Sequence, residues 1–196
     1  MSTTSKPKAI YTIGHSTRSF EELVSILRSF DIQAVADVRL IPKSRRFPHF
    51  NDEFLTTELP KRGIAYLSFR SLGGRRRARK DSPNLGWRNE SFRGYADFMQ
   101  TPAFEQALEE LMSAAKERAT TTMCAEAVPW RCHRSLISDA LLVRGWRVMD
   151  VMGEGKAVPH KLTEFARVEG ATIVYPAPVP ELFAEFDDDA RRKRGN

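Results

Sequence analysis

The chain has 196 residues, a length typical of one domain with a sizeable core. Its net charge of +6 and pI near 9.5 indicate an anionic partner, a nucleotide or a nucleic acid, although a merely solvated basic surface would give the same values. Two cysteines are too few for a typical secreted disulfide scaffold, and no apolar run is long enough to span a membrane, so we expect a cytoplasmic protein.

Predicted strands and helices alternate along the chain. In order they are a strand at 9–13, a helix at 20–30, a strand at 34–38, a helix at 51–62, a strand at 64–69, helices at 91–99 and 102–118, a strand at 121–125, a helix at 133–144, a strand at 146–152, a short helix at 159–167 and a strand at 171–175. We expect a flexible N-terminus (1–8), one domain (9–180) and a charged flexible tail (187–196).

This alternation predicts an α/β fold with a mostly parallel sheet and helices on both faces, a Rossmann-like three-layer sandwich. Ligands bind such sheets at the carboxyl ends of the strands. The polar segments that follow four predicted strands should therefore meet at one edge. They are 14–16, 37–39, 71–74 and the segment from 124 onward.

Four motifs occur in a specific order. They are YTIGHS at 11–16, DVR at 37–39 with Pro42 and Ser44, LGG at 72–74, and MCAE at 123–126 with CHR at 132–134. Together they resemble the bacterial family catalogued as domain of unknown function 488, over about residues 10 to 152. The resemblance implies a typical member with no appended domain, and it implies no particular activity.

Cys132 and His133 are predicted to lie at a helix N-terminus, between Arg131 and Arg134. The positive end of a helix and nearby arginines favour a thiolate and can also bind phosphate. Cys132 is therefore a candidate nucleophile or anion contact, or else a buried residue that caps the helix. Cys124 lies in an apolar run, where we expect a packed core residue.

Glu126 follows the end of a predicted strand, where a carboxylate can act as general base or pair with Arg131 or Arg39. His15 follows another strand and is a candidate catalytic partner. Asp37 and Arg39 point the same way from one strand, so they form either a structural bridge or an acid beside an anion contact.

Basic side chains with interleaved aromatic residues fill two long loops, a composition typical of surfaces that bind single-stranded nucleic acid or a flipped base. A flexible, solvated loop would have the same composition. The candidate substrate or phosphate contacts are Ser16, Arg39, Ser44, Gly73, Gly74, Arg75, Trp130, Arg131, His133 and Arg134.

We consider three functions. The preferred one is a hydrolase acting on a phosphodiester or N-glycosidic bond of a nucleotide or nucleic acid, with Glu126, His15, Asp37 and Cys132 as catalytic candidates. The second is a thiol or sulfur-transfer enzyme that uses Cys132. The third is a non-catalytic DNA- or RNA-binding protein. We expect no cofactor and no metal, because no CxxC or HxxxH spacing occurs.

Overall fold

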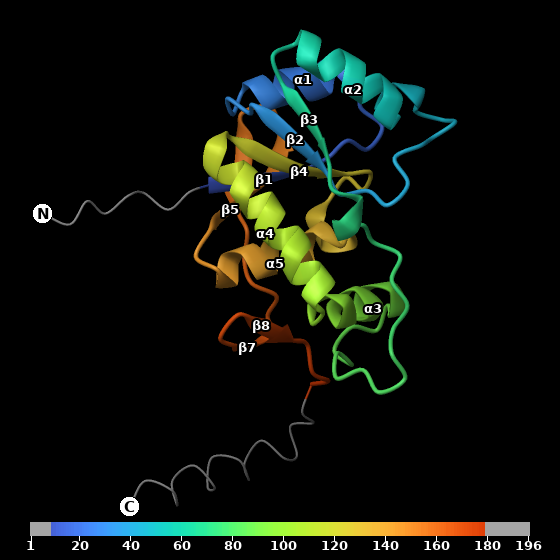
Figure 1. Ribbon diagram of the computed structural model, residues 1–196, viewed down its shortest axis with the longest axis vertical. Helices are drawn as coiled ribbons and strands as arrows, with labels where there is room; N and C mark the ends of the chain where they lie inside the picture. Colours follow the sequence, from blue (N-terminus) through green and yellow to red (C-terminus); the bar gives the residue numbers. More distant parts are fainter. Residues whose placement is uncertain (1–8, 179–196) are drawn as a thin grey trace, which may run out of the picture.

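The computed structural model describes residues 9–178, which fold around one six-stranded sheet with spatial order β3-β2-β4-β1-β5-β6 (Figure 1). The first five strands are parallel, and β6 is antiparallel to β5. The strands are β1 (Ala9–Gly14), β2 (Ala34–Asp37), β3 (Ala65–Ser68), β4 (Thr120–Cys124), β5 (Arg147–Gly153) and β6 (Lys156–Pro159). The predicted α/β fold is confirmed. The segments 1–8 and 187–196 lie outside the described residues.

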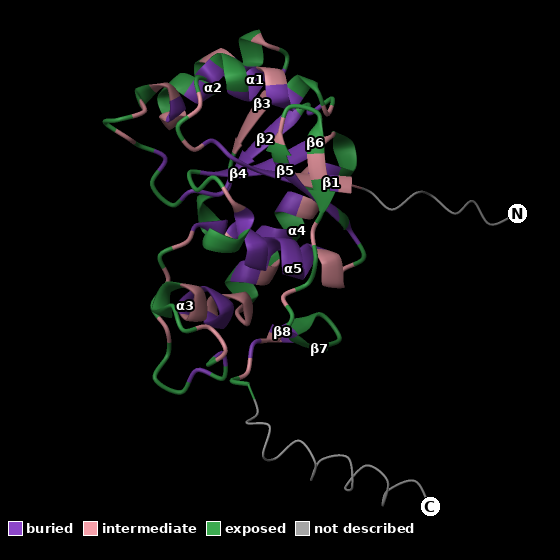
Figure 2. Cartoon of the chain, turned by 180° about the vertical axis from the view of Figure 1, so that it is seen from behind, coloured by how far each residue is buried: buried purple, intermediate pink, exposed green. Residues whose placement is uncertain are grey.

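Helices cover both faces of this sheet (Figures 1 and 2). They are α1 (Phe20–Arg28), α2 (Asp52–Lys61), α3 (Glu90–Met99), α4 (Pro102–Glu117) and α5 (Arg134–Val143). One core lies under α1 and α2 and includes Ile13 and Met123. The other lies under α4 and α5 and includes Ile10 and Cys124. Because side chains alternate along a strand, each buried strand supplies both cores.

The two central strands, β1 and β4, are neighbours, yet the chain leaves them toward opposite faces of the sheet. After β1 it forms α1 on one face, and after β4 it forms α5 on the other. The carboxyl edge of the sheet is the usual position of a ligand site in such folds.

The chain after β5 differs from the prediction. The helix predicted at 159–167 is wrong, because a turn with Gly155 in the left-handed region (φ 63°) reverses the chain into β6. The side chain of Asp139 then holds the following loop by accepting hydrogen bonds from the backbone and hydroxyl of Thr163. The last predicted strand forms β8 (Thr172–Val174), which among residues 9–178 pairs only with β7 (Arg167–Glu169), in a separate hairpin.

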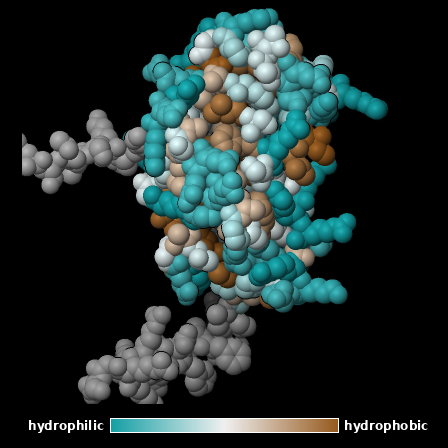
Figure 3. All heavy atoms as spheres, viewed as in Figure 1, coloured by the Kyte–Doolittle hydropathy of each residue, from teal (hydrophilic) through white to brown (hydrophobic). Residues whose placement is uncertain are grey.

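Sequence signals explain the helix boundaries near the site. Ser19 and Glu22 form a capping box at the start of α1, and Thr101 caps α4 with Pro102 in its first turn. Among the described residues no helix is long and apolar enough to cross a membrane. Hydrophilic side chains cover most of the face that Figure 3 shows, with a few hydrophobic patches between them.

Candidate functional site: a cysteine pair at the carboxyl edge of the sheet

The four loops singled out by the sequence leave the sheet side by side. Gly14 at the end of β1 is in register with Cys124 at the end of β4, and Asp37 of β2 is in register with Met123. Directly after β3, the backbone N–H of Phe69 donates to the carbonyl of Asp37. The ends of these strands therefore share one edge of the sheet, as the strand-end rule predicts.

The turn at 125–127 passes directly over Gly14. A Cβ atom at that position would lie 1.7 Å from the carbonyl oxygen of Glu126, so no side chain fits. Arg134, which is 1% exposed, fixes the turn from inside. Its Nη1 donates to Thr12 Oγ1 (2.8 Å) and its Nη2 donates to the Glu126 carbonyl (2.6 Å). Arg134 thus positions the loop that follows β4.

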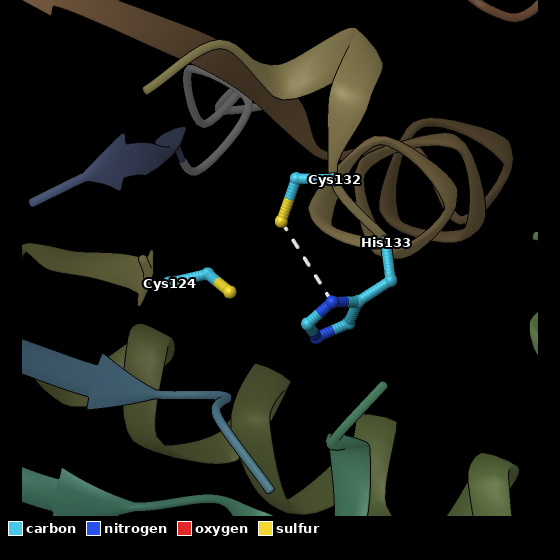
Figure 4. A group of neighbouring side chains, drawn as sticks. All are labelled: Cys124, Cys132 and His133. Carbon is cyan, nitrogen blue, oxygen red and sulfur yellow. Dashed lines mark hydrogen bonds between the residues drawn. The ribbon is translucent and has the colours of Figure 1, made fainter. Parts of the chain in front are cut away.

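Two thiols and one imidazole meet at the centre of this edge (Figure 4). Cys124 ends β4, whereas Cys132 and His133 lie between the short helix η3 (Pro129–Arg131) and α5. The three side chains point toward one space, and their sulfur and nitrogen atoms all lie within 4.8 Å of one another. Cys132 Sγ is 3.7 Å from His133 Nδ1, within hydrogen-bonding range for sulfur. The sequence analysis predicted Cys132 and His133 at this edge of the sheet, and it expected Cys124 to be a packed core residue.

The orientation of the His133 ring is fixed on two sides. Its Nε2 lies 3.0 Å from the carbonyl oxygen of Val38, which can only accept, so Nε2 carries a hydrogen. In the neutral ring the lone pair of Nδ1 then faces the sulfur of Cys132. On the other side, Gly74 leaves room for the ring, because a Cβ there would lie 2.9 Å from Nδ1. Gly74 of the LGG motif therefore makes room for the imidazole of His133.

The two thiols differ in acidity. A hydrogen bond from the Cys124 thiol lowers the pKa of Cys132, and His133 and the buried Arg134 lower it further against the opposing effect of burial. The same hydrogen bond raises the pKa of Cys124, and burial adds to that shift. Of the two thiols, Cys132 is therefore the one whose thiolate form is favoured.

His15 and Asp37 lie behind the cavity and hold Arg39. Asp37 accepts from Arg39 Nε (2.8 Å) and Nη2 (2.5 Å), and Phe50 accepts from Nη2 through its carbonyl (2.8 Å). Arg39 Nη1 lies 3.2 Å from His15 Nε2. Burial, followed by the positive charge of Arg39, lowers the pKa of His15 to about 4, so the ring is neutral and accepts this hydrogen bond. Asp37 and Arg39 thus form a buried ion pair, and Arg39 also lines the cavity over the cysteines.

A cavity of about 360 Å³ lies over the cysteine pair. Arg39, Gly74, Arg75, Glu126, Arg131 and His133 line it together with the two cysteines. Among residues 9–178, the side chains of Arg75 and Arg131 form no hydrogen bond or ion pair, and both are exposed. Arg75 also has a left-handed backbone (φ 59°), which non-glycine residues seldom adopt. These two guanidinium groups remain available for an anionic ligand.

The long basic loop is more ordered than its composition predicts. Asp97 of α3 accepts hydrogen bonds from the Arg79 backbone and from the side chains of Ser82 and Asn84. The guanidinium of Arg76 donates to two loop carbonyls, one of them Gly73, and stacks 3.8 Å from the centre of the Phe98 ring. Some arginines of this loop, such as Arg76, therefore hold the loop together, whereas others, such as Arg75, are exposed.

Some predicted contacts lie away from the cavity lining. These are Ser16, Ser44, Gly73, Trp130 and Arg134. Ser44 caps its own loop by accepting from the Phe47 backbone, and Trp130 faces a second cavity. The lining also includes residues that sequence reasoning missed as site residues, notably Asn89 and Ser91. The only signal for Asn89 was its position as the N-cap of α3.

The cysteine pair and His133 are also a possible metal site. Two sulfurs and one nitrogen within 4.8 Å form the donor set of a three-ligand zinc site. The contact of His133 Nε2 with the Val38 carbonyl is the outer contact that metal-binding histidines usually make. The residues present therefore fit a zinc ion, although the expected spacing motifs are missing.

The fold and the site together define an α/β protein with a buried cysteine pair at the carboxyl edge of a parallel sheet. A family model described as domain of unknown function DUF488 matches residues 19–141, and the chain belongs to this family. Comparisons with curated proteins and with solved structures gave no match.

Proposed function

We propose that the protein is a thiol enzyme in which Cys132 attacks a sulfur atom of an anionic disulfide and Cys124 resolves the product. One observation carries the proposal. Both sulfurs and His133 Nδ1 lie within 4.8 Å of one another in a cavity that is also lined by Arg75 and Arg131, whose side chains form no hydrogen bond or ion pair among residues 9–178. A single nucleophile would suffice for acyl or phosphoryl transfer, whereas a second thiol beside the first suits disulfide chemistry.

The reaction has two exchange steps. The Cys132 thiolate attacks one sulfur of the substrate, forms a mixed disulfide and releases the other half as a thiolate. Cys124 then loses its proton to that thiolate and attacks Cys132 Sγ. The second half of the substrate leaves as a thiolate, and the protein holds a Cys124–Cys132 disulfide. The substrate is reduced by two electrons and the protein dithiol is oxidised by two.

The surroundings of the pair support these roles. The lone pair of His133 Nδ1 faces Cys132 and can accept the thiol proton, which yields an imidazolium beside the thiolate. Arg75 and Arg131 stand at the cavity and would attract carboxylates of the substrate. Both cysteines are free, which suits a reducing compartment such as the cytoplasm.

Trapping with glutathione disulfide, an anionic disulfide, tests the proposal. After treatment with a chelator, the wild-type protein should form the internal disulfide, seen by mass spectrometry as the loss of two hydrogens. Cys124→Ser should stop at a glutathione adduct on Cys132. Cys132→Ser should form almost none on Cys124, because burial alone still raises the pKa of that thiol after the hydrogen bond with Cys132 is lost. One equivalent of zinc should suppress the reaction by ligating both thiols.

Two results would overturn the proposal. One is a folded wild-type protein that forms neither an adduct nor the internal disulfide. The other is a Cys132→Ser variant that reacts as fast as Cys124→Ser. The ultraviolet absorbance of the thiolate, followed against pH, gives a measure independent of reagent access. It should place the pKa of Cys132 well below the usual thiol value of about 8.5.

A hydrolytic reaction on a nucleotide or nucleic acid is the second candidate. Glu126 favours it, since this carboxylate lines the same cavity as Arg131 and forms no side-chain hydrogen bond among the described residues. His15 and Asp37 do not line the cavity, so Glu126 would act without them. Hydrolysis that is lost in Glu126→Gln and kept in Cys132→Ser would favour this candidate over the thiol mechanism.

A further inference from the structure

A second cavity, of about 660 Å³, lies on the other side of η3. Its walls come from η3, from β5 and β6, from the loop at 160–164 and from Trp87. Most of the surface that faces this cavity is apolar, and half of the lining residues are apolar or aromatic: Trp87, Pro129, Trp130, Val158, Pro159 and Leu162. The volume is in the range of small-molecule sites, which combine apolar walls with a few placed polar groups.

Two of the polar groups in this lining have no partner. Among the described residues, three buried side-chain nitrogen or oxygen atoms form no hydrogen bond, and two of them are Trp87 Nε1 and Asp150 Oδ1. Both residues line the cavity, and Asp150 is only 7% exposed. One atom is a donor and the other an acceptor, so a ligand with a complementary acceptor and donor would satisfy both.

The carboxylate of Asp150 is held firmly in its orientation. Its Oδ2 accepts from His160 Nδ1 (3.0 Å), and His160 Nε2 contacts Asp139 (3.2 Å). Asp139 is completely buried and also accepts from the hydroxyl of Tyr175 (2.8 Å). Because this network uses Oδ2, only Oδ1 remains for a ligand. A preorganised acceptor of this kind selects ligands that carry an N–H group.

Trp130 supplies a stacking surface beside these groups. It is 62% exposed, lies on η3 and lines the same cavity. A large exposed indole is well suited to stack on a planar ring.

We propose that this cavity binds a planar nitrogen heterocycle of the nucleobase type. The ring stacks on Trp130, one ring N–H donates to Asp150 Oδ1, and one ring acceptor receives the indole N–H of Trp87. The proposal does not depend on the thiol reaction, because neither cysteine lines this cavity. Such a ring can come from a free nucleoside or from a base turned out of a nucleic-acid strand.

Indole N–H resonances of the ¹⁵N-labelled full chain provide the test, since the chain has three tryptophans. Adenosine, guanosine, cytidine and uridine are added one at a time, and a short single-stranded oligonucleotide is added separately. At least one probe should shift the resonances of Trp87 and Trp130, while that of Trp146, buried outside the cavity, should stay in place. Shifts with nucleosides identify a free ligand, and shifts with the oligonucleotide alone identify a strand.

Variants separate stacking from hydrogen bonding. Trp130→Ala should weaken binding about tenfold, a typical loss for one stacked base. Asp150→Asn should weaken it by removing the charged acceptor. Trp87→Phe keeps an aromatic ring at this position but removes the five-membered ring with its N–H, so it tests the donor even if Asp150→Asn fails to fold. Trp146→Phe is the matched control. The proposal is overturned if no probe shifts either resonance at the highest soluble concentration, or if Trp130→Ala and Trp87→Phe bind like the wild type.

Discussion

Replacing His160 with glutamine should change how protein stability depends on pH. The imidazole lies between Asp139 and Asp150 and its side chain is 7% exposed. Burial alone would lower the pKa of His160, but the hydrogen bonds and charges of the two carboxylates outweigh it and raise the pKa to about 9, from 6.5. At about 1.4 kcal/mol per pKa unit, the protonated ring favours the folded state by about 3 kcal/mol.

The sign follows from the raised pKa. The contribution is complete below about pH 6.5, where the ring is protonated in both states, and it is lost as the pH rises through about 9. Urea unfolding of the wild type and His160→Gln at about pH 6 and about pH 9.5 measures it. The stability difference between the two proteins should shrink by about 3 kcal/mol over that range, since other groups titrate in both. A difference that stays constant with pH would refute the reasoning.

Two further predictions concern residues around the cysteine pair. Gly74→Ala should displace the His133 ring and slow the reaction of Cys132 with glutathione disulfide about fivefold, the worth of one hydrogen bond, while Gly153→Ala, with open space around it, should react normally. His15→Gln should remove an acid-sensitive contribution. Because the pKa of His15 is lowered to about 4, the wild type should lose stability relative to this variant as the pH falls from about 6.5 to 4 in urea titrations, and equal pH profiles would contradict this.

The sequence was sufficient to predict which loops meet at one edge of the sheet, but not which side chains contact one another there. Strand-end positions correctly brought Gly74, Cys132 and His133 together, because carboxyl ends of parallel strands share one edge. Cys124 was expected in the core, and it is buried there, but it also lines the cavity. A strand covered on both faces is apolar throughout, so its pattern does not show which residue faces a ligand. Its contact with Cys132 depends on how η3 turns the chain back.

The buried network around His160 was beyond prediction for a different reason. Asp139 lies on α5, Asp150 on β5 and His160 after β6, so only the antiparallel turn at Gly155 brings them together. The sequence analysis predicted no strand between residues 152 and 171, so it missed β6 and the turn that leads into it. Asp37 and Arg39 show the converse case, because residues close in sequence could be predicted to pair, and they do so in a buried position beside His15.

The short helix η3 relates the two cavities to each other. Trp130 lines the larger cavity, and the next residue, Arg131, lines the cavity over the cysteines. Two features fix η3. The Cys132 backbone N–H donates to the carbonyl of Pro129, and Pro129 itself is buried. A ligand that stacks on Trp130 therefore acts on the same turn that holds Cys132.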